Sequence, residues 1–555
     1  MPVRRGIALA AVAASVAVLA ADAALIAQAV RGATPEIQSF DGLNNNLAHP
    51  RWGLLATSLL RGTSGAHYAD GRSAPAGQKR PLARQISNAI FKQQGSIPNA
   101  SGLSDYIWTW GQFLDHDLSL SIAPQGNLPI PVPAFDPEFD PAGTGTQTIV
   151  FRRTFSNPLT GVTTPREQLN LVSSYIDGSM VYGTEPYRAR WLRTFVGGEL
   201  KVTATPMGDL LPYNDGTQLN AGNPEQVSYS KLLFVAGDIR VNEQPTLAAL
   251  HTVFMREHNF QARRIRRDHP ELKDEQIYQE ARRIVIAEIQ HVTYDEFLPA
   301  LLGGDGLGSD PGYDPNVNAG VGILFSTAAF RLGHTLLSPM LLRLEEDGRA
   351  SARGSLSLRD TFFEPTPPIL AADGVEPLLR GLAAQTAQEL DDKVIDDVRN
   401  FLFGKPGAGG LDLISLNIQR GREVGLPDFN TVRADVGLPR KPTFEAVTSS
   451  PGKAATLSRL YGGDVNDIDA FVGFLTEDRL PGHPVGETLR AVLVDQLSRS
   501  RAGDRFWYER TLEPVDLRRV ASTRLSDVIR RNTAIQAIQD NVFFVGLRAP
   551  APATR

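Results

Sequence analysis

The hydrophobic pattern along most of this chain has the period of an α-helix. In TLAALHTVFMREHNFQARRIRR, residues 246–267, apolar residues recur at helical spacing and no Gly or Pro interrupts them, so the segment predicts an amphipathic helix. The same pattern predicts a long helix over 274–303, ended by a glycine pair, and another over 486–510.

Strand signals are few and short. TIVFRRT, residues 148–154, is one of them, and the surrounding segment 123–165 is rich in Pro, Gly and Thr, which break helices. A length of 555 residues would suit three or four domains of about 150 residues each. However, no internal repeat and no clear linker separates residue 40 from residue 545. We therefore expect a mainly α-helical fold, a single large domain with few short strands.

The N-terminus has the layout of a signal peptide. Arg4 and Arg5 precede an apolar run, and small residues then offer A-x-A cleavage sites up to residue 29. An uncleaved anchor is the alternative, but Asp22 interrupts the run short of the roughly 20 apolar residues that a span requires. We expect a secreted or periplasmic protein with no stable membrane span. The expected divisions are a signal peptide at 1–29, a linker at 30–38, the domain at 39–548 and a tail at 549–555.

Composition excludes several classes of function. The 56 basic and 61 acidic residues leave a net charge of −5, which gives no reason to expect a nucleic-acid partner. Cysteine is absent, so disulfide-linked oligomers, thiolate metal ligands, a cysteine nucleophile and c-type haem attachment are all excluded. Any cofactor must therefore be held by His, carboxylates, backbone groups or non-covalent packing.

Residues 113–120, FLDHDLSL, carry three adjacent polar side chains in an apolar stretch. On a helix, Asp115, His116 and Asp117 would point about 100° apart from one to the next. Gln112 would share the face of His116, since the two are four residues apart. Asp115 and Asp117 would point roughly 200° apart, so their carboxylates cannot serve one small site. Taken alone, the motif could equally be a capped or salt-bridged buried turn.

Four further segments carry polar side chains that need an explanation. SSYIDGSMVYG offers an oxygen donor at every second residue, which is how a loop can wrap Ca²⁺, although a Ser-rich turn explains it as well. A lone histidine among leucines and an isolated asparagine are ordinary core or turn residues. The candidates are Ser173, the Tyr175 carbonyl, Asp177 and Ser179 in that segment, Asp238, Arg240 and Glu243 in AGDIRVNEQ, His334 in AFRLGHTLLSP, and Asn417 and Arg420 in DLISLNIQRGRE.

In this order, the motifs resemble the signatures of the animal-type haem peroxidases, a family that also has many bacterial, peroxidasin-like members. The resemblance extends from FDGLNNNLAHP near residue 40 to DNVFF at 540–544. It implies a mostly helical fold that encloses haem b. It also implies a haem peroxidase that reduces hydrogen peroxide through an oxoferryl intermediate and oxidises a halide, a pseudohalide or a phenolic donor.

The resemblance assigns a role to each candidate. His116 would be the distal base, Arg240 the distal cation, and Gln112 would hold distal water or a small anion. His334 would be the proximal ligand of the haem iron, oriented by Asn417. The remaining implied roles are ester bonds to haem methyl groups for Asp115 and Glu243, a haem propionate contact for Arg331, haem binding for Arg420, and a Ca²⁺ site for Asp117, Ser173, Tyr175, Asp177 and Ser179.

Three positions depart from the family pattern. Gln244 stands where the most strongly chlorinating member has a methionine joined to a haem vinyl group, so no sulfonium link can form here. This argues against chloride as a donor and leaves bromide, iodide, thiocyanate and organic donors. Glu423 and Val424 replace the acidic and histidine positions that commonly follow Asn417, which we expect to alter the packing around it.

Three other functions fit the sequence less well. A fatty-acid dioxygenase of the same superfamily needs a tyrosine three residues before the proximal histidine, where this chain has Arg331. A non-catalytic adhesion protein with a peroxidase shell would be expected to lose some of His116, Arg240, His334 and Asn417, and all four are present. A metalloprotease is weaker still, because MREHN lacks the H-E-x-x-H spacing and is expected to form internal hydrogen bonds in a buried helix.

Overall fold

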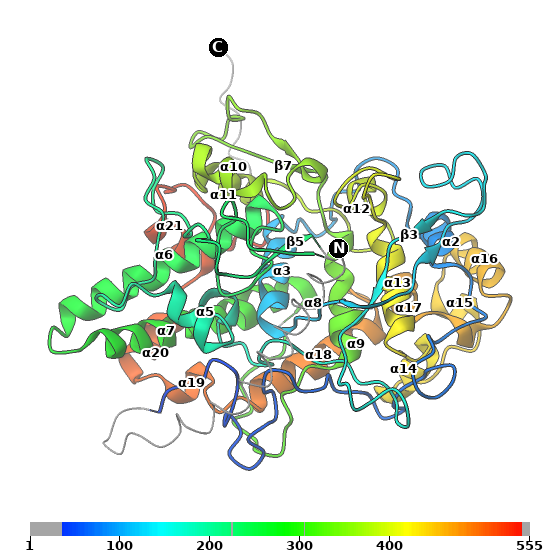
Figure 1. The fold of residues 1–555 in the computed structure, drawn as a ribbon, viewed down its shortest axis with the longest axis horizontal. Helices are drawn as coiled ribbons and strands as arrows, with labels where there is room; N and C mark the ends of the chain where they lie inside the picture. Colours follow the sequence, from blue (N-terminus) through cyan, green and yellow to red (C-terminus); the bar gives the residue numbers. More distant parts are fainter. Residues whose placement is uncertain (1–35, 224–225, 305, 547–555) are drawn as a thin grey trace, which may run out of the picture. The chain divides into compact units, whose positions relative to one another are not determined.

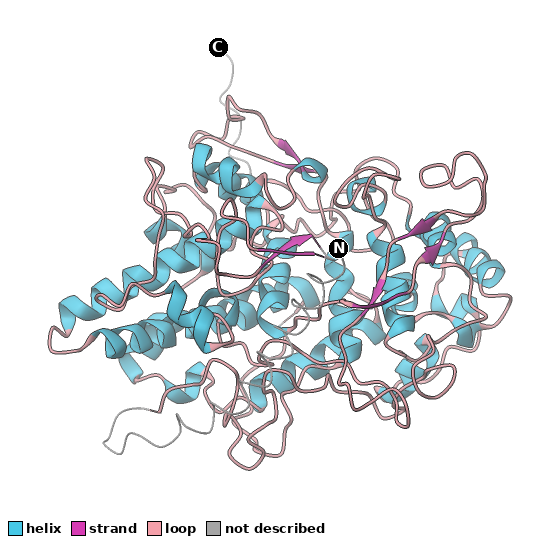
Figure 2. Cartoon of the chain, in the orientation of Figure 1, coloured by secondary structure: helices cyan, strands magenta, loops and turns pink. Residues whose placement is uncertain are grey.

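Helices dominate the computed structural model, which describes residues 36–223, 226–304 and 306–546 (Figures 1 and 2). The chain divides into a unit of residues 1–38 and a unit of residues 39–555, and the helices and strands that the structure describes belong to the second. The predicted signal peptide and C-terminal tail lie outside the described residues. Within the described ranges, no helix combines the length and the apolar character needed to cross a bilayer.

Helix α3 (Tyr106–Leu118) lies at the centre of the core and buries eleven of its 13 residues. It packs against α4 (Ser179–Tyr182), α6 (Pro245–Asp268) and the 3₁₀ segment η3 (Ala329–Thr335). The ring centroids of Phe113 and Phe254 lie 5.2 Å apart, and those of Trp110 and Phe254 lie 5.7 Å apart. A helix that is buried on nearly every face is held rigidly by its neighbours, which suits α3 to position reactive side chains.

Helices α6 (Pro245–Asp268) and α7 (Asp274–His291) lie side by side and form a long hairpin (Figure 1). The side chain of Gln244 accepts a hydrogen bond from the backbone N–H of Thr246 at 2.7 Å, which satisfies one of the free donors at the start of α6. The helix predicted over 246–267 is therefore confirmed to within one residue at each end.

Two predicted helices are interrupted. Helix α7 continues as the π-helical segment η2 (Val292–Phe297) and then as α8 (Leu298–Leu302). Helix α18 (Glu487–Ala502) ends before α19 (Tyr508–Thr511), so the single helix predicted over 486–510 is wrong. The break has a local cause, because the Asp504 carboxylate accepts hydrogen bonds from Asn45 and from the backbone N–H of Phe506 at 2.7 and 2.8 Å, and this holds the chain in a turn.

The strands that the structure describes form short antiparallel pairs, and the segment predicted as one strand over 148–154 contributes to two of them. The pairs are β1 (Gln125–Asn127) with β4 (Arg152–Arg153), β2 (Ile130–Pro131) with β3 (Thr148–Ile149), β5 (Asn220–Asn223) with β6 (Gln226–Ser228), and β7 (Met340–Leu341) with β8 (Leu356–Ser357). In the second pair, Ile130 lies opposite Ile149, and both are buried.

The remaining helical segments surround this core. They are α2 (Ala83–Ile86), η1 (Ser87–Phe91), α4 (Ser179–Tyr182), α5 (Pro186–Leu192), α9 (Ile323–Thr327), η3 (Ala329–Thr335), η4 (Leu358–Asp360), α10 (Thr366–Asp373), α11 (Glu376–Ala384), α12 (Asp396–Arg399), α13 (Leu413–Glu423), α14 (Phe429–Asp435), α15 (Phe444–Val447), α16 (Pro451–Leu460), η5 (Val465–Asp467), α17 (Ala470–Thr476), α20 (Pro514–Ala521) and α21 (Leu525–Asn532).

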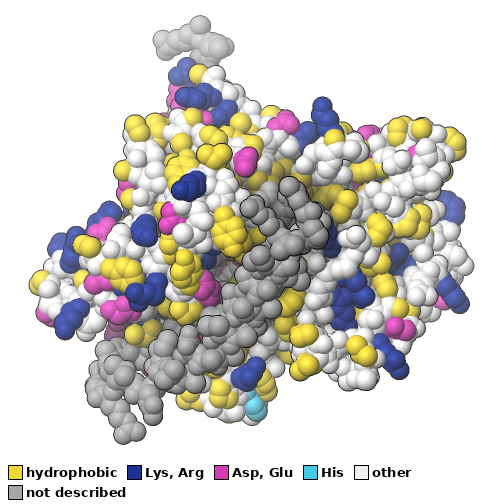
Figure 3. All heavy atoms as spheres, in the orientation of Figure 1, with side chains coloured by type: hydrophobic (Ala, Val, Ile, Leu, Met, Phe, Trp, Pro, Cys, Tyr) yellow, Lys and Arg dark blue, Asp and Glu magenta, His cyan; other side chains and the backbone are white. Residues whose placement is uncertain are grey.

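Charged side chains of both signs are mixed over the face of the molecule shown in Figure 3. Basic and acidic groups both occur there, and the coloured atoms in view form no single extended basic surface. This distribution agrees with the small net charge and gives no support to a polyanionic partner on that face.

Candidate active site

Helix α3 and the loop before α6 bring four predicted residues together. Gln112 donates a hydrogen bond from Nε2 to Oε2 of Glu243 at 3.0 Å. Nε2 of His116 lies 3.8 Å from the same carboxylate oxygen. Arg240 donates from Nη2 to the backbone oxygen of Ser119, just beyond the end of α3, at 2.9 Å. The residues predicted as distal base, cation and anion holder are therefore neighbours.

The environment of His116 keeps its imidazole neutral. Its side chain is almost fully buried, and this burial, together with the positive charge of Arg240, lowers its pKa well below the ordinary value. Nδ1 has no hydrogen-bonding partner in the described part of the chain. A neutral imidazole can accept a proton, which is what a general base requires.

Two carboxylates lie beside these groups. Oδ2 of Asp115 is 3.7 Å from Nη1 of Arg240 and 3.9 Å from Nη1 of Arg331, while its Oδ1 accepts a hydrogen bond from Ser119 at 3.0 Å. Burial raises the pKa of Glu243 to about 7, against the opposing effect of Arg240. Both carboxyl groups therefore lie at the same site as His116, as the family resemblance implies.

Segments η3 and α13 supply the second histidine. The side-chain amide nitrogen of Asn417 lies 2.8 Å from Nδ1 of His334; a half-turn of the amide would place its oxygen there, so Asn417 can pair with either tautomer. Burial, and then Arg331, lower the pKa of His334 to about 3. The ring is thus neutral at pH 7, and Nε2 has no hydrogen-bonding partner among the described residues.

These features fit a haem iron ligand. A histidine that binds metal through one nitrogen commonly has the other held by a neighbouring group, as His334 does. A Cβ atom at Gly333 would meet no other heavy atom within 4 Å, so the chain leaves open space beside the histidine. Arg331 links this segment to the distal side through its approach to Asp115.

Arg420 is engaged mainly by protein groups. Its Nη1 donates to the backbone oxygen of Arg152, to Oγ1 of Thr154 and to Oε2 of Glu423, at 2.9, 2.6 and 3.0 Å. Glu423, one of the departures from the family pattern, is fully buried and also accepts from Arg166 at 3.0 Å. The acidic residue therefore anchors a local arginine network, and haem binding by Arg420 stays a prediction.

The loop that ends at α4 meets the opposite side of α3. Oδ1 of Asp117 accepts from Ser179 Oγ at 2.7 Å, and Ser173 donates to Oδ2 of Asp177 at 2.5 Å. Tyr175, whose carbonyl is the other predicted donor, lies between Ser173 and Asp177 in the sequence and is fully buried. Asp115 and Asp117 thus have separate surroundings, as their spacing on a helix predicts.

The donor set fits a hard cation. Burial raises the pKa of Asp117 to about 6, and burial together with the charge of Asp117 raises the pKa of Asp177 well above its ordinary value. A divalent cation would remove this mutual repulsion. Within the described ranges, no three or more His, Cys, Asp or Glu side chains are grouped to hold a metal. A Ca²⁺ site here would need the serine and carbonyl oxygens as well as the two carboxylates.

The MREHN segment forms internal hydrogen bonds, as expected. Glu257 accepts from Gln261 at 2.6 Å and from Arg531 at 2.9 Å. The ring nitrogen Nδ1 of His258 lies 3.0 Å from the hydroxyl of Tyr182. Glu257 and His258 therefore both have hydrogen-bonding partners inside the protein, which leaves no basis for a protease site.

Asp238 is the residue whose importance the sequence did not reveal. The family resemblance assigns a role to Arg240 and none to Asp238. In the structure it is buried and bonded to Arg240 at 2.7 Å, and its Oδ1 lies 3.6 Å from Nδ1 of His116. The sequence signal for this role is that Asp238 lies two residues before Arg240, since an aspartate can bond both the backbone N–H and the side chain of a residue two positions later.

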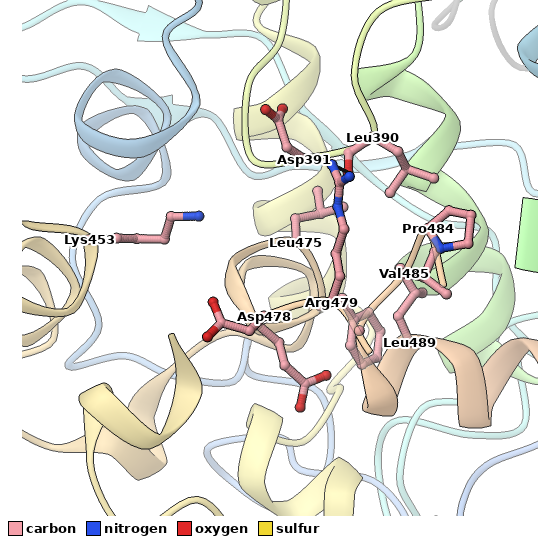
Figure 4. A pocket seen from close by; sticks show the side chains of 12 residues that line it. Leu390, Asp391, Lys453, Leu475, Asp478, Arg479, Pro484, Val485 and Leu489 are labelled. Carbon is pink, nitrogen blue, oxygen red and sulfur yellow. Dashed lines mark hydrogen bonds between the residues drawn. The ribbon is translucent and has the colours of Figure 1, made fainter. Parts of the chain in front are cut away.

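A cavity of about 210 Å³ lies elsewhere, between the segment at Leu390 and Asp391 and helices α17 and α18 (Figure 4). Its lining includes Lys453 and Arg479 but none of the predicted site residues. Arg479 is already paired with Glu389 at 2.9 Å. The cavity therefore gives no reason to move the site away from His116 and His334.

The fold and the grouping of these side chains fit the class of haem-binding oxidoreductases that the sequence motifs resemble. A family model described as animal haem peroxidase matches residues 37–543. Peroxinectin A of Dictyostelium discoideum is 39% identical over 519 residues, covering 92% of this chain and 96% of that protein. A peroxidasin homolog of Mus musculus is 34% identical over 92% of this chain, but the match spans 37% of that protein.

Solved structures agree. Peroxidase A from Dictyostelium discoideum matches with a TM-score of 0.85 and 38% identity, covering 92% of this chain and 100% of that chain. A fatty acid alpha-dioxygenase from Arabidopsis thaliana matches with a TM-score of 0.76 at 20% identity, which shows a shared fold alone. The chain belongs to the animal haem peroxidase family. It is a haem peroxidase, and the predicted mainly helical, single-domain fold is confirmed.

Proposed function

We propose that this enzyme is exported and uses hydrogen peroxide to oxidise bromide, iodide, thiocyanate or a phenolic donor. The observation that carries the proposal is the buried neutral His116 grouped with Arg240 and Gln112. This set can accept a proton and stabilise negative charge within one small site. The N-terminal sequence pattern supports export to the periplasm or the medium.

The bound haem supplies the iron at which peroxide is reduced, and His334 would ligate that iron. Arg331 and Arg420 would contact the haem, and Asp115 and Glu243 would form ester bonds to its methyl groups. His116 takes a proton from hydrogen peroxide and returns it to the departing hydroxide. Arg240 stabilises the negative charge that develops on the leaving oxygen. Gln112 orients water or a small anion on the same helix face.

The residue at position 244 bears on the donor. The Gln244 side chain donates to Oε1 of Gln112 at 3.2 Å and accepts from the N–H of Thr246. It therefore supports the distal glutamine and caps α6, and it has no sulfur with which to modify the haem. This supports bromide, iodide, thiocyanate or phenols as donors rather than chloride.

We also assign a Ca²⁺ ion to Asp117, Ser173, Tyr175, Asp177 and Ser179. Its support is the pair of buried, mutually repelling carboxylates formed by Asp117 of α3 and Asp177 of the loop beside it. Since Asp117 follows His116 directly, the ion would stiffen the turn that carries the distal base. Loss of the ion would then weaken both the loop and the distal geometry.

The test is the visible absorption spectrum of the haem-loaded protein lacking residues 1–29, before and after hydrogen peroxide. A Soret band that shifts with peroxide and recovers on adding bromide, iodide, thiocyanate or a phenol is the expected result. A Soret band inert to peroxide would remove the roles proposed for His116 and Arg240. Recovery with chloride as fast as with bromide would contradict the donor assignment.

A further inference from the structure

Asp238 lies where the two distal side chains meet. It belongs to the loop between β6 and α6, and only 3% of its surface is exposed. Its backbone N–H donates to the oxygen of Met180 at 3.0 Å. A Cβ atom at the preceding Gly237 would collide with the backbone of Ser179. The loop is therefore clamped against α4, and the Asp238 carboxylate has a fixed position.

This carboxylate binds Arg240 in three ways. Oδ1 accepts from the backbone N–H of Arg240 at 2.7 Å and from its Nε at 2.9 Å, and Oδ2 accepts from Nη2 at 2.7 Å. Two parallel charge-assisted bonds hold a guanidinium plane in one orientation. The remaining guanidinium nitrogen, Nη1, lies 3.7 Å from Oδ2 of Asp115.

The same carboxylate faces His116. Oδ1 of Asp238 lies 3.6 Å from Nδ1, which has no hydrogen-bonding partner among the described residues. A carboxylate beside one ring nitrogen favours the tautomer that carries the proton on that nitrogen. Nε2 would then carry the lone pair; the Glu243 carboxyl group on that side lies farther away, at 3.8 Å, and burial raises its pKa to about 7, so it is the less charged of the two carboxyl groups. Distances between such groups are often long before substrate binds and shorten afterwards.

Packing alone does not explain an ionised group here. Burial by itself raises the pKa of Asp238, but the charge and hydrogen bonds of Arg240 hold it well below its ordinary value, so the carboxylate stays charged. Burying a charge is costly unless a partner compensates it. An apolar residue would fill the space without that cost, so the charge itself needs a purpose.

We propose that Asp238 is a positioning residue that fixes the guanidinium plane of Arg240 and holds the proton of His116 on Nδ1. The inference rests on the roles proposed above for His116 and Arg240 and adds the group that orients both. Asp238 does not touch peroxide. It acts by presenting Nε2 of the base and Nη1 of the cation in one fixed arrangement.

The test uses fluoride, a ligand of ferric haem that accepts hydrogen bonds from neighbouring donors, and the Asp238→Asn variant of the holoenzyme. We expect the fluoride dissociation constant, measured from the Soret band, to rise by about tenfold or more, since a charge-assisted hydrogen bond is lost or misdirected. The rate of reaction with peroxide should fall in parallel. Asp238→Glu, which retains the charge, should recover part of both.

Asp136→Asn is the matched control. Asp136 is equally buried and binds Nε and Nη2 of Arg84 at 2.7 and 3.2 Å, so it has the same pairing away from the distal residues. We expect fluoride affinity within about threefold of the parent in this variant. A similar loss in both variants, or none in Asp238→Asn, overturns the proposal.

Two further measurements separate the possible failures. If Arg240→Ala leaves fluoride binding unchanged, the role proposed for Arg240 fails; if it weakens binding and Asp238→Asn does not, the inference about Asp238 alone fails. The tautomer is measured in the unmodified, diamagnetic carbon monoxide complex by ¹⁵N resonances of histidine, with His116 assigned by its absence from His116→Gln. A proton on Nδ1 supports the proposal, and a proton on Nε2 overturns it, even if Asp238→Asn does not fold.

Discussion

At the scale of single residues, the site depends on two histidines that are neutral for the same reason. Burial is the largest cause of the lowered pKa of both His116 and His334, and Arg240 and Arg331 add positive charge beside them. Neutral imidazole is the form that accepts a proton and the form that ligates iron. Different tasks therefore follow from what each ring nitrogen contacts.

Replacing His116, the proposed distal base, should slow the reaction with peroxide and leave haem in place. In His116→Gln we expect the second-order rate constant to fall by on the order of 10² to 10⁴, the usual contribution of a general acid–base group. Stopped-flow absorption at the Soret band measures it. His269→Gln changes an exposed histidine and should match the parent. A fall of less than about threefold in His116→Gln would exclude His116 as the base.

Replacing Asn417 should weaken the binding of haem through His334, the proposed iron ligand. Its amide lies 2.8 Å from Nδ1 of His334, and loss of such a partner commonly costs about 10- to 100-fold in metal affinity or activity. In Asn417→Ala we therefore expect faster haem loss to a scavenger protein and a shifted reduction potential. Asn430→Ala, on the nearby α14 and bonded to the backbone of Lys441, is the control. Equal haem loss in the two variants would make the effect one of general stability.

At the scale of elements, α3 joins two sites on its opposite faces. His116 belongs to one and Asp117 to the other, and the second site joins α3 to the loop that ends at Ser179. A cation bound there would stabilise the folded state by mass action. The same binding would restrain the last turn of the helix that holds the base.

Removing divalent cations should therefore lower thermal stability. We expect a chelator to lower the Tm of the parent by a few degrees and Ca²⁺ to restore it, since ligand that binds only the folded state stabilises it. Asp177→Asn should weaken this response because one carboxylate is lost and the other is no longer repelled. Calorimetry with and without Ca²⁺ measures both. An unchanged Tm on chelation in the parent would contradict a calcium site on this loop.

Elements also show what the sequence could predict. The helix over α6 follows from an unbroken apolar stripe, and the divergence of Asp115 from Asp117 follows from helical geometry alone. The turn at Asp504 does not, because it depends on a hydrogen bond from Asn45, which lies 459 positions away. For the same reason, the pairing of Asn417 with His334 came from resemblance and not from periodicity.

At the scale of the whole molecule, burial also isolates carboxyl groups that no cation compensates. Asp105, at the start of α3, is 1% exposed and accepts a hydrogen bond from Ser338 Oγ at 2.8 Å, which ties α3 to the chain just after η3. Burial raises its pKa to about 8, against the effect of its hydrogen bonds. Folding therefore keeps a proton on this group that the unfolded chain would release near pH 4.

The consequence is a loss of stability as pH rises. Because the pKa of Asp105 is higher in the folded state, its contribution is fully present below about pH 4 and is lost progressively up to about pH 8, with a slope of about 1.4 kcal/mol per pH unit between them. Asp105→Asn cannot ionise, so we expect the free energy of unfolding to fall less steeply with pH in this variant than in the parent.

Denaturant unfolding at several values between pH 5 and pH 8 measures the difference between the two slopes. The control is Asp347→Asn, since Asp347 is half exposed and its pKa is lowered by hydrogen bonds to Arg349, so it titrates below this range. Equal slopes in Asp105→Asn and the parent would mean that Asp105 is already ionised in the folded state. In that case a positive charge or water must reach Asp105 at the start of α3, and the conclusion that the core excludes solvent from this end of the helix would be wrong.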